Sequence, residues 1–260
     1  MSAVRMDGKA LSAKVRGSIL AETEALKEKG VTPGLAVIIV GNDPASEIYV
    51  RNKEKACAEC GFYSEKYALP AETSQEELLG LIAQLNQSPQ ISGILCQMPV
   101  PDHISEQAVI DAIDPKKDVD AFHPVNVGKI MVGNFDFVPC TPAGVMELLD
   151  EYGIDPKGKE CVVVGRSNIV GKPMSMLLLH RHGTVTICHS RTSGLAAVCR
   201  RADILVAAVG KAGFITPDMV KDGAVVIDVG INRNAQGKVC GDVAPEVMEK
   251  GSYMTPVPGG

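Results

Sequence analysis

A charged stretch at positions 49–57, "YVRNKEKAC", contains a tyrosine and a lysine four residues apart. If this segment is helical, Ser46, Tyr49 and Lys53 share one face, because residues three and four apart are neighbours on a helix. Lys55 then points elsewhere. A buried lysine of such a stripe could carry protons in catalysis, whereas an exposed one would simply be solvated. The spacing alone leaves both interpretations open.

Polar groups also follow other strand-like runs of the first half of the chain. Gln97 precedes a proline-stiffened turn in "CQMPVPDHI", and Asp118 and Asp120 lie in "KKDVDAFHP". The helix of Lys53 is expected to begin near Ala45, directly after the strand "LAVIIV". Carboxyl ends of parallel strands meet at one edge of a sheet, so we expect these groups to lie close together.

A second candidate site lies in "CVVVGRSNIVGKP", where a buried strand runs through a Gly-led turn into an apolar helix. Helix N-terminal amides at such a turn bind phosphate groups. The match to GxGxxG is imperfect, because Ser167 replaces the second glycine and Gly171 comes one position late, while Gly165 fits. A triphosphate-binding P-loop is disfavoured, because Pro173 stands where Ser or Thr is needed.

The next strand-like run indicates which dinucleotide is favoured. "TVTICHSRT" ends without the Asp or Glu that accepts a hydrogen bond from the ribose of NAD. Ser190 and Arg191 would instead accept a 2′-phosphate, and Arg166 adds a second cation. NADP is therefore expected, with NAD as the alternative cofactor. Polar turn residues without a ligand remain an alternative interpretation of this unit.

Glycines at the ends of two later strand-like runs, "ILVAAVG" and "AVVIDVG", let the backbone approach a ligand closely. Gly210, Gly230 and Ile231 are candidates to line the nicotinamide half of a dinucleotide site. Tight strand-to-loop turns are the equally good alternative.

Short β-branched runs alternate with helical patterns along the chain, which is typical of α/β architecture. Ser74 and Glu77 form a capping box, and a second helix is expected with Thr141 as its cap, Pro142 in its first turn and Gly153 as its stop. We predict two α/β domains, residues 1–140 and a Rossmann-like, doubly wound parallel sheet over 141–260. The helix after Thr141 is expected to bridge them.

Composition limits the function classes. The chain has 260 residues, 45% of them hydrophobic, and a formal net charge of -5, which argues against a nucleic-acid binder. Eight scattered cysteines are expected to be buried free thiols of a reducing compartment, and Cys57 and Cys60 lack the second pair that a zinc site needs. We expect no metal, no membrane segment and a cytoplasmic location.

Taken in order, these motifs match a known family over nearly the whole chain. They are "YVRNKEKAC", "QMPVPDHI", "DVDAFHPVNVGK", "PCTPAGVMELL", "VVVGRSNIVGKP", "CHSRT", "DILVAAVG", "VIDVGIN", "GDV" and "TPVPGG". The chain resembles the bifunctional methylenetetrahydrofolate dehydrogenase/methenyltetrahydrofolate cyclohydrolases. The resemblance implies a cytoplasmic homodimer with two α/β domains flanking a cleft, NADP as cofactor and tetrahydrofolate substrates.

The resemblance also implies residue roles. Lys53 would be the catalytic lysine, Tyr49 its partner beside the folate, Gln97 a polar neighbour of the lysine, and Asp120 the carboxylate that holds the pterin ring. The cofactor contacts would be Gly165, Arg166, Ser167, Ser190 and Ile231. Pro258 and Gly259 would complete the substrate site together with the residues named first.

Two reactions would share this site: hydride transfer from the methylene carbon to the nicotinamide, and addition of water to the methenyl cation. We expect Lys53 to move the protons of the second reaction, because burial and the adjacent cation both favour its neutral amine.

Two features depart from the family pattern. Ala121 stands where the family commonly has Gly, and the sequence stops at "TPVPGG", where the family continues with a Gly-rich turn and a final helix. Because that helix packs on the first domain, lower stability or weaker binding is expected without it. The alternatives are another two-domain NADP-dependent dehydrogenase, of shikimate or amino-acid type, and a non-catalytic folate sensor.

Overall fold

A computed structural model describes residues 2–260, apart from the side chain of Ala45. The described chain divides into two compact units. We call them the first unit, with residues 13–129 and 135–137, and the second unit, with residues 2–12, 130–134 and 138–260.

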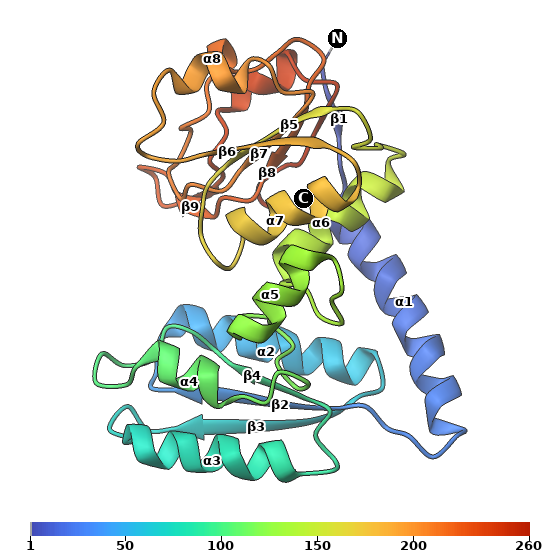
Figure 1. Cartoon of the computed structure of the whole chain (residues 1–260), viewed down its shortest axis with the longest axis vertical. Coiled ribbons are helices and arrows are strands. Elements are labelled where there is room, and N and C mark those ends of the chain that lie inside the picture. The colour runs from blue at the N-terminus through green and yellow to red at the C-terminus, as the bar shows by residue number, and fades with distance from the viewer. Residues whose placement is uncertain (1) are drawn as a thin grey trace. The chain divides into compact units, whose positions relative to one another are not determined.

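The first unit is built on a three-stranded parallel sheet with the strand order β3-β2-β4. Figure 1 shows α2 on one face of this sheet and α3 and α4 on the other. The elements are α1 (Gly8–Lys27), β2 (Gly34–Val40), α2 (Pro44–Glu59), β3 (Tyr63–Leu69), α3 (Gln75–Gln87), β4 (Gly93–Cys96), α4 (Glu106–Ala112) and α5 (Pro124–Val132).

Strand β2 is apolar throughout because both of its faces are covered. Ile38 and Val40 pack with Leu78 in the cluster under α3. Val37, which points the other way, packs with Val50 of α2. Side chains alternate between the faces of a strand, so a strand buried on both sides needs a continuous apolar run. The "LAVIIV" motif is such a run.

The second unit contains a six-stranded sheet in the order β1-β11-β8-β7-β5-β6, and every pair in it is parallel. α6 and α7 lie on one face and α8 on the other (Figure 1). The elements are β1 (Val4–Arg5), α6 (Cys140–Glu151), β5 (Glu160–Val164), α7 (Gly171–His180), β6 (Thr184–Cys188), α8 (Leu195–Cys199), β7 (Ile204–Ala207), η1 (Pro217–Met219), β8 (Val225–Asp228), β9 (Asn232–Arg233), β10 (Val239–Cys240), η2 (Pro245–Glu249) and β11 (Tyr253–Met254).

The chain order in this sheet reverses at β5, which pairs with β6 on one side and β7 on the other. Connections on either side of such a switch point leave in opposite directions and open a crevice at the carboxyl ends of the strands, where α/β folds bind ligands. The doubly wound parallel sheet predicted for this half of the chain is confirmed.

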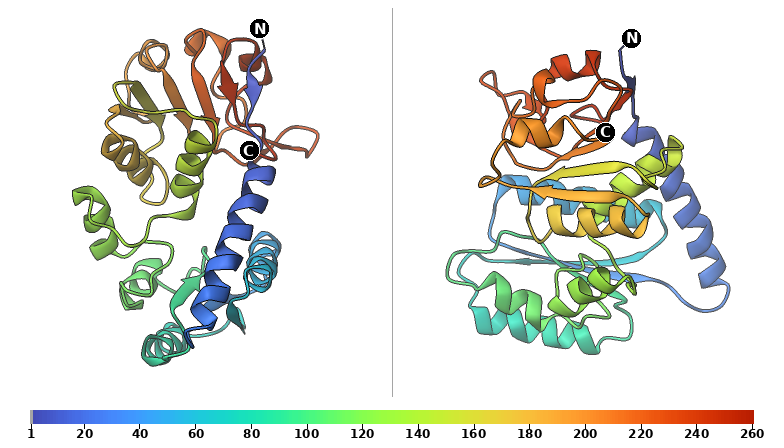
Figure 2. Two further views of the ribbon diagram at one scale, coloured as in Figure 1. Left: turned by 90° about the vertical axis from the view of Figure 1, so that its right-hand side faces the viewer. Right: turned by 45° about the horizontal axis from the view of Figure 1, so that its top comes forward.

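Two features of the predicted organisation differ from the structure. The bridging role predicted for the helix after Thr141 is wrong, because α6 belongs wholly to the second unit. The chain instead passes between units within α1, within α5 and on either side of residues 135–137. The N-terminal residues also join the second unit, because Val4 pairs with Tyr253 across β1 and β11. Figure 2 shows β1, in blue, beside the red end of the chain.

Strand β3 was not predicted from the sequence. Its residues, "YSEKYAL", are mostly polar and none is fully buried, because β3 is the edge strand of its sheet. Edge strands carry charged and polar side chains that do not produce a buried-strand pattern.

The predicted helix ends are largely confirmed. Ser74 and Glu77 form the capping box at the start of α3. α6 begins at Cys140 after Pro139, so Thr141 is not its cap. Gly153 follows the end of α6 with φ of 64°, as expected for a helix stop.

Buried free thiols occur at Cys57, Cys60, Cys96, Cys161, Cys188 and Cys199. Among residues 2–260, no helix has the length and apolarity needed to cross a membrane.

Helices α6 and α7 end in the same backbone motif with different residues. After α6, Gly153 and Ile154 donate backbone N–H groups to Asp150 and Leu149. After α7, the exposed His182 takes the glycine position with φ of 63° and donates to Leu179. A side chain in this left-handed conformation is sterically unfavourable.

Replacing His182 with Gly should therefore raise the free energy of unfolding by about 0.5–1 kcal/mol, since the left-handed strain exceeds the entropy that Gly adds to the unfolded chain. Gly153→Ala is the matched reverse change and should lower it by a similar amount. Urea unfolding followed by circular dichroism measures both. A loss of stability in His182→Gly would contradict this account.

Candidate active site

Lys53 and Gln97 meet at the edge of the first unit's sheet. The Lys53 Nζ donates a hydrogen bond to Gln97 Oε1 at 2.8 Å. Gln97 follows β4, and its backbone N–H is held by the Ile38 carbonyl of the neighbouring strand. The amide thus comes from a rigid strand end and fixes the position of the lysine amine.

Helix α2 directs the two lysines of the charged stretch to different surroundings, as their spacing predicted. Asp43 caps its start by accepting a hydrogen bond from Ser46 N–H at 2.7 Å. Lys53 is half-buried, whereas Lys55 points to solvent and forms an exposed ion pair with Glu59. Tyr49, one turn before Lys53, is 47% exposed. Lys53 is therefore the lysine of this stretch that belongs to a polar site.

The segment that carries Asp120 is anchored by two buried polar side chains. Asp118 accepts hydrogen bonds from the His123 backbone N–H at 2.8 Å and from Asn126 Nδ2 at 2.9 Å. Asn126 Nδ2 also donates to the Pro115 carbonyl. These bonds cross-link the loop on either side of Asp120, so that its carboxyl group has a defined position.

Ala121 shows what the departure from the family pattern means for this loop. It is fully buried and has φ of 55°, in the left-handed region that favours glycine. The chain tolerates the side chain there with some backbone strain. The loop conformation therefore explains why glycine suits this position.

Electrostatics connect Asp120 with Lys53. Burial raises the pKa of Asp120 to about 6, the Lys53 ammonium partly offsets the rise, and the nearby Asp118 adds to it. Burial likewise raises the pKa of the Cys96 thiol to about 12, with a smaller contribution from Asp120. The first unit thus brings Lys53, Gln97 and Asp120 into one partly desolvated cluster.

In the second unit, glycines make the turn after β5 tight. A Cβ on Gly165 would lie 2.4 Å from the Ala208 carbonyl oxygen, so only glycine allows β5 and β7 to approach here. A Cβ on Gly171 would lie 2.3 Å from the Gly165 oxygen. Gly171 thus performs the close packing of helix on turn that the last glycine of a dinucleotide fingerprint provides, although it comes one position late.

Ser167 lies at the start of α7. Its Oγ accepts hydrogen bonds from the N–H groups of Val170 at 3.1 Å and Gly171 at 3.2 Å. Arg166, in the same turn, is exposed. The Ser167 side chain therefore binds two of the amides at the N-terminus of α7, and phosphate binding by this turn stays a prediction.

The turn after β6 presents the residues predicted to select the cofactor. Thr192 Oγ1 accepts from His189 N–H at 2.9 Å, and the His189 ring nitrogen accepts from Arg191 N–H at 3.1 Å. Ser190 and Arg191 are both exposed. This turn follows the strand next to β5, so it lies on the same edge of the sheet as Gly165.

Three further predicted site residues lie beyond the carboxyl ends of other strands of the second unit. Ile231 follows β8 and is 67% exposed. Pro258 and Gly259 follow β11, and the Gly259 carbonyl accepts from Gly8 N–H at 3.0 Å. The predicted residues therefore fall into two groups, one in each unit.

The sequence analysis did not single out two buried acids of the second unit, Asp228 and Asp242. Asp228 ends the apolar run of β8, and Asp242 lies in "GDV". A carboxyl group inside an apolar run was the signal that could have identified them, because unpaired charges are rarely buried.

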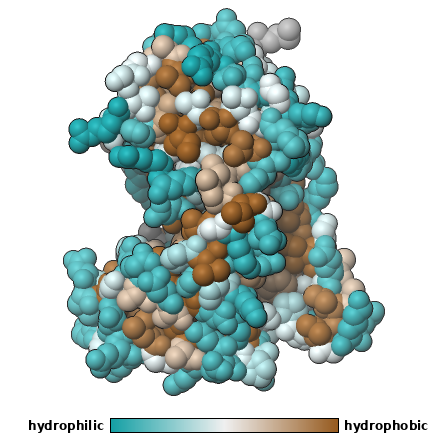
Figure 3. Space-filling model, in the orientation of Figure 1, coloured by the Kyte–Doolittle hydropathy of each residue, from teal (hydrophilic) through white to brown (hydrophobic). Residues whose placement is uncertain are grey.

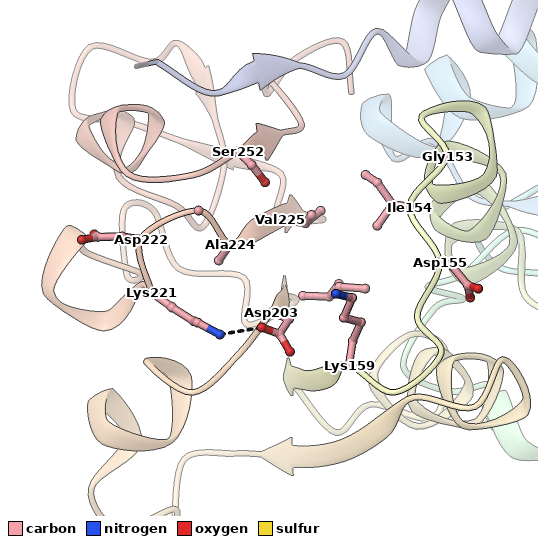
Figure 4. A pocket seen from close by; sticks show the side chains of 12 residues that line it. Gly153, Ile154, Asp155, Lys159, Asp203, Lys221, Asp222, Ala224, Val225 and Ser252 are labelled. Carbon is pink, nitrogen blue, oxygen red and sulfur yellow. Dashed lines mark hydrogen bonds and ion pairs between the residues drawn. The ribbon is translucent and has the colours of Figure 1, made fainter.

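A cavity of about 420 Å³ lies elsewhere in the second unit. Figure 4 shows it at the amino ends of β7 and β8, with Lys221 directed at Asp203. Its charged residues also include Asp222, which pairs with Lys250. The cavity is therefore distinct from the carboxyl edge that carries the predicted cofactor residues. Within residues 2–260, no group of three or more His, Cys, Asp or Glu residues is placed to hold a metal ion.

These features define a two-unit α/β enzyme that combines a Rossmann-like unit with a unit carrying a lysine, amide and carboxyl cluster. Residues 6–120 match the model "Tetrahydrofolate dehydrogenase/cyclohydrolase, catalytic domain", and residues 139–260 match the "NAD(P)-binding domain" of the same family. The chain belongs to the tetrahydrofolate dehydrogenase/cyclohydrolase family.

Individual proteins agree with this assignment. The chain is 62% identical to the bifunctional protein FolD of Acetivibrio thermocellus over 100% of its own length and 92% of the relative. The crystal structure of the bifunctional FolD enzyme of Campylobacter jejuni has a TM-score of 0.97 and 48% identity, covering 100% of this chain and 93% of that one. The Trypanosoma brucei FolD structure, complexed with NADP cofactor and inhibitor, has a TM-score of 0.93 and 39% identity, covering 100% and 92%.

The charge of the half-buried Asp120 should reduce stability at neutral pH. Its folded-state pKa of about 6 lies above the usual 3.8, so the folded chain binds more protons than the unfolded chain between about pH 4 and pH 6. The contribution of Asp120 to the free energy of unfolding therefore falls as the pH rises from about 4 to about 6. Asp120→Asn should therefore raise the free energy of unfolding at pH 7 by about 1–3 kcal/mol, with little gain near pH 4.

Urea unfolding of both proteins at pH 7 and pH 4 measures this difference. Asp102→Asn, at an exposed position of the same unit, is the matched control and should change little. An Asp120→Asn protein that is no more stable than the wild type at pH 7 would refute the electrostatic account.

Proposed function

We propose that this chain catalyses both reactions of its family: NADP-dependent oxidation of 5,10-methylenetetrahydrofolate to 5,10-methenyltetrahydrofolate, and hydrolysis of that product to 10-formyltetrahydrofolate. The observation that carries the proposal is the Lys53–Gln97 hydrogen bond of 2.8 Å near the half-buried Asp120, whose pKa is raised to about 6. The family assignment rules against the shikimate-type alternative, because both units match the folate family.

In the oxidation, the bound nicotinamide supplies the hydride acceptor, and the protein supplies orientation. A hydride leaves the methylene carbon with its bonding electrons, and the substrate becomes the methenyl cation. We propose that Asp120 accepts hydrogen bonds from the amino and ring N–H groups of the pterin edge. We propose that Asp120 orients the folate and that Tyr49 lines the same substrate site.

In the hydrolysis, water adds to the methenyl carbon, loses a proton, and the ring then opens to the formyl product. We assign these proton transfers to Lys53. Its amine is held by Gln97 Oε1, so it is positioned rather than freely mobile. The amine of Lys53, in its neutral form, is the group able to take the proton from water.

Replacing Lys53 with Met removes the proton carrier and should lower the rate of methenyltetrahydrofolate hydrolysis by at least about 10²-fold. The loss of methenyl absorbance over time measures this rate. Lys55→Met is the matched control, because Lys55 points to solvent on the same helix, and it should keep the wild-type rate. Full hydrolysis by the Lys53→Met protein would overturn the assignment.

We infer NADP as the cofactor from three polar residues at the mouth of the second unit's crevice: Arg166, Ser190 and Arg191. The FolD relative from Trypanosoma brucei was solved with NADP, which supports this inference. The residues assigned to the cofactor further include Gly165 and Ser167 of the turn and Ile231 near the nicotinamide. Pro258 and Gly259 are assigned to the folate side.

Arg191→Ala should lower kcat/KM with NADP by roughly tenfold or more, because a charge-assisted bond to the 2′-phosphate is lost. With NAD, which lacks this phosphate, kcat/KM should change less than about threefold. Initial rates of cofactor reduction at several concentrations of each dinucleotide provide both values. Equal losses with NADP and NAD would place Arg191 outside the 2′-phosphate site.

We further propose a cytoplasmic homodimer. β6 is an edge strand with Ile187 38% exposed, and Leu179 of the adjacent α7 is 48% exposed. Figure 3 shows that apolar patches interrupt the hydrophilic surface. Proteins tend to cover apolar edges by association, and sedimentation equilibrium of the purified chain tests the proposed homodimer.

The free cysteines support a reducing compartment.

A non-catalytic folate sensor is the second candidate function. The wild-type chain mixed with methylenetetrahydrofolate and NADP distinguishes the two. An enzyme produces methenyl and reduced-cofactor absorbance with time, whereas a sensor binds the folate without either signal.

A further inference from the structure

Two buried carboxyl groups at the carboxyl edge of the second unit have no role in the mechanism above. Asp242 is fully buried, and Asp228 is 8% exposed. They come from different segments, since Asp228 ends β8 and Asp242 follows the hairpin of β9 and β10. Burial raises the pKa of Asp228, and hydrogen bonds from backbone N–H groups only partly offset this effect.

The carboxyl group of Asp242 gathers four N–H donors. Its Oδ2 accepts from the backbone of Val209 at 2.6 Å and Gly210 at 3.0 Å. Its Oδ1 accepts from the backbone of Lys211 at 2.8 Å and from Asn232 Nδ2 at 2.8 Å. One side chain thereby joins the loop after β7 to the segment after β8.

Asp228 completes this arrangement from the other side. Its Oδ1 accepts from the N–H groups of Gly230 at 3.0 Å and Asp242 at 2.8 Å. Space for both carboxyl groups depends on glycine, because a Cβ on Gly230 would lie 2.2 Å from Asp242 Cγ, and one on Gly241 would lie 1.8 Å from Asp228 Oδ2. The two acids and two glycines form one close-packed network.

Of residues 209–211 and 230–232, Val209 packs against the apolar core, and the others lie outside it. Gly210 and Lys211 are exposed, and Ile231, between Gly230 and Asn232, is 67% exposed. Amides in exposed loops can bind water instead, and burying a carboxyl group carries a desolvation cost. A gain in stability therefore does not account for this network. Its clear effect is to fix the geometry of the two loops.

We propose that Asp242 is a positioning residue for hydride transfer: it fixes the loops at residues 209–211 and 230–232, which line the nicotinamide half of the cofactor. This inference rests on the proposed function. Asp242 does not touch the cofactor; it acts through Gly210 and Ile231. A displacement of about 1 Å between reacting atoms can slow a reaction by about 10²-fold, so loops at this place need a rigid support.

Asp242→Asn tests the role with nearly the same shape. An Asn amide offers one oxygen, and its NH₂ group must face two of the four donors, so at least one loop has to shift. We expect the dehydrogenase kcat at saturating NADP to fall by about 10- to 100-fold. The hydrolysis of methenyltetrahydrofolate, which uses Lys53 of the first unit, should stay within about threefold.

Two further measurements separate positioning from other roles. The deuterium isotope effect on kcat, with substrate labelled at the methylene carbon, should increase, because hydride transfer becomes slower than product release. The Kd of NADP, followed by fluorescence, should change by less than about threefold, because Gly165, Ser167 and Ser190 hold the rest of the cofactor. A lost NADP affinity with unchanged kcat would overturn the proposal.

Asp203→Asn is the matched control. Asp203 lies in the same unit at the amino edge of the sheet, and its carboxyl group also holds a backbone N–H, that of Glu160, and a cation, Lys221. This variant should lose stability without a selective loss of dehydrogenase activity. Asn232→Ala removes one bond of the Asp242 network and gives a second variant if Asp242→Asn does not fold. It should reduce the dehydrogenase kcat a few-fold in the same selective way.

The outcomes are distinguishable. A selective loss of hydride transfer in Asp242→Asn or Asn232→Ala supports the inference. Unchanged dehydrogenase activity in both, or equal loss of both activities, overturns it and leaves the proposed function intact. A wild-type chain with neither activity overturns the proposed function, and this inference with it.

Discussion

Parallel pairing of buried strands is the constraint on which both units depend. It gives every strand of a sheet the same direction, so all carboxyl ends and the turns that follow them gather at one edge. Gln97 reaches Lys53 for this reason in the first unit. In the second unit, the same geometry brings Gly165 so close to Ala208 that a Cβ on Gly165 would lie 2.4 Å from the Ala208 carbonyl oxygen. Chemistry-bearing residues from distant parts of the sequence can therefore meet without any long-range sequence signal.

Buried carboxyl groups are the second theme of the structure. Asp120 is half-buried near Lys53, and burial raises the pKa of this carboxyl group to about 6, whereas Asp228 and Asp242 are surrounded by N–H donors. The first arrangement suits a ligand that supplies its own N–H groups, because the carboxyl group is only half-buried. The other two are already satisfied by the chain and so act as fixed supports. Burial thus serves recognition in one unit and rigidity in the other.

Local patterns predicted those parts of the fold that depend on neighbours in sequence. Apolar runs identified the central strands, and the capping box of Ser74 identified the start of α3. Patterns were misleading where a partner lies far along the chain. The edge strand β3 has too few apolar residues to be recognised, and β1 joins the second unit only because β11 is there to pair with it. The prediction that the helix after Thr141 bridges the two units was also wrong, because α6 belongs to the second unit.

By itself, the sequence determined the α/β class, the stripe of Tyr49 and Lys53 on α2, and the Gly-led turn after β5, because helix periodicity, strand burial and glycine geometry act over a few residues. Its ordered motifs also indicated the family. Only the tertiary structure decided that Gln97 holds Lys53, that the loop of Asp118 and Asn126 places Asp120 beside it, and that Asp242 ties two loops together. Those contacts depend on hydrogen bonds between residues that lie from 8 to 44 positions apart and on different elements, which no local pattern encodes.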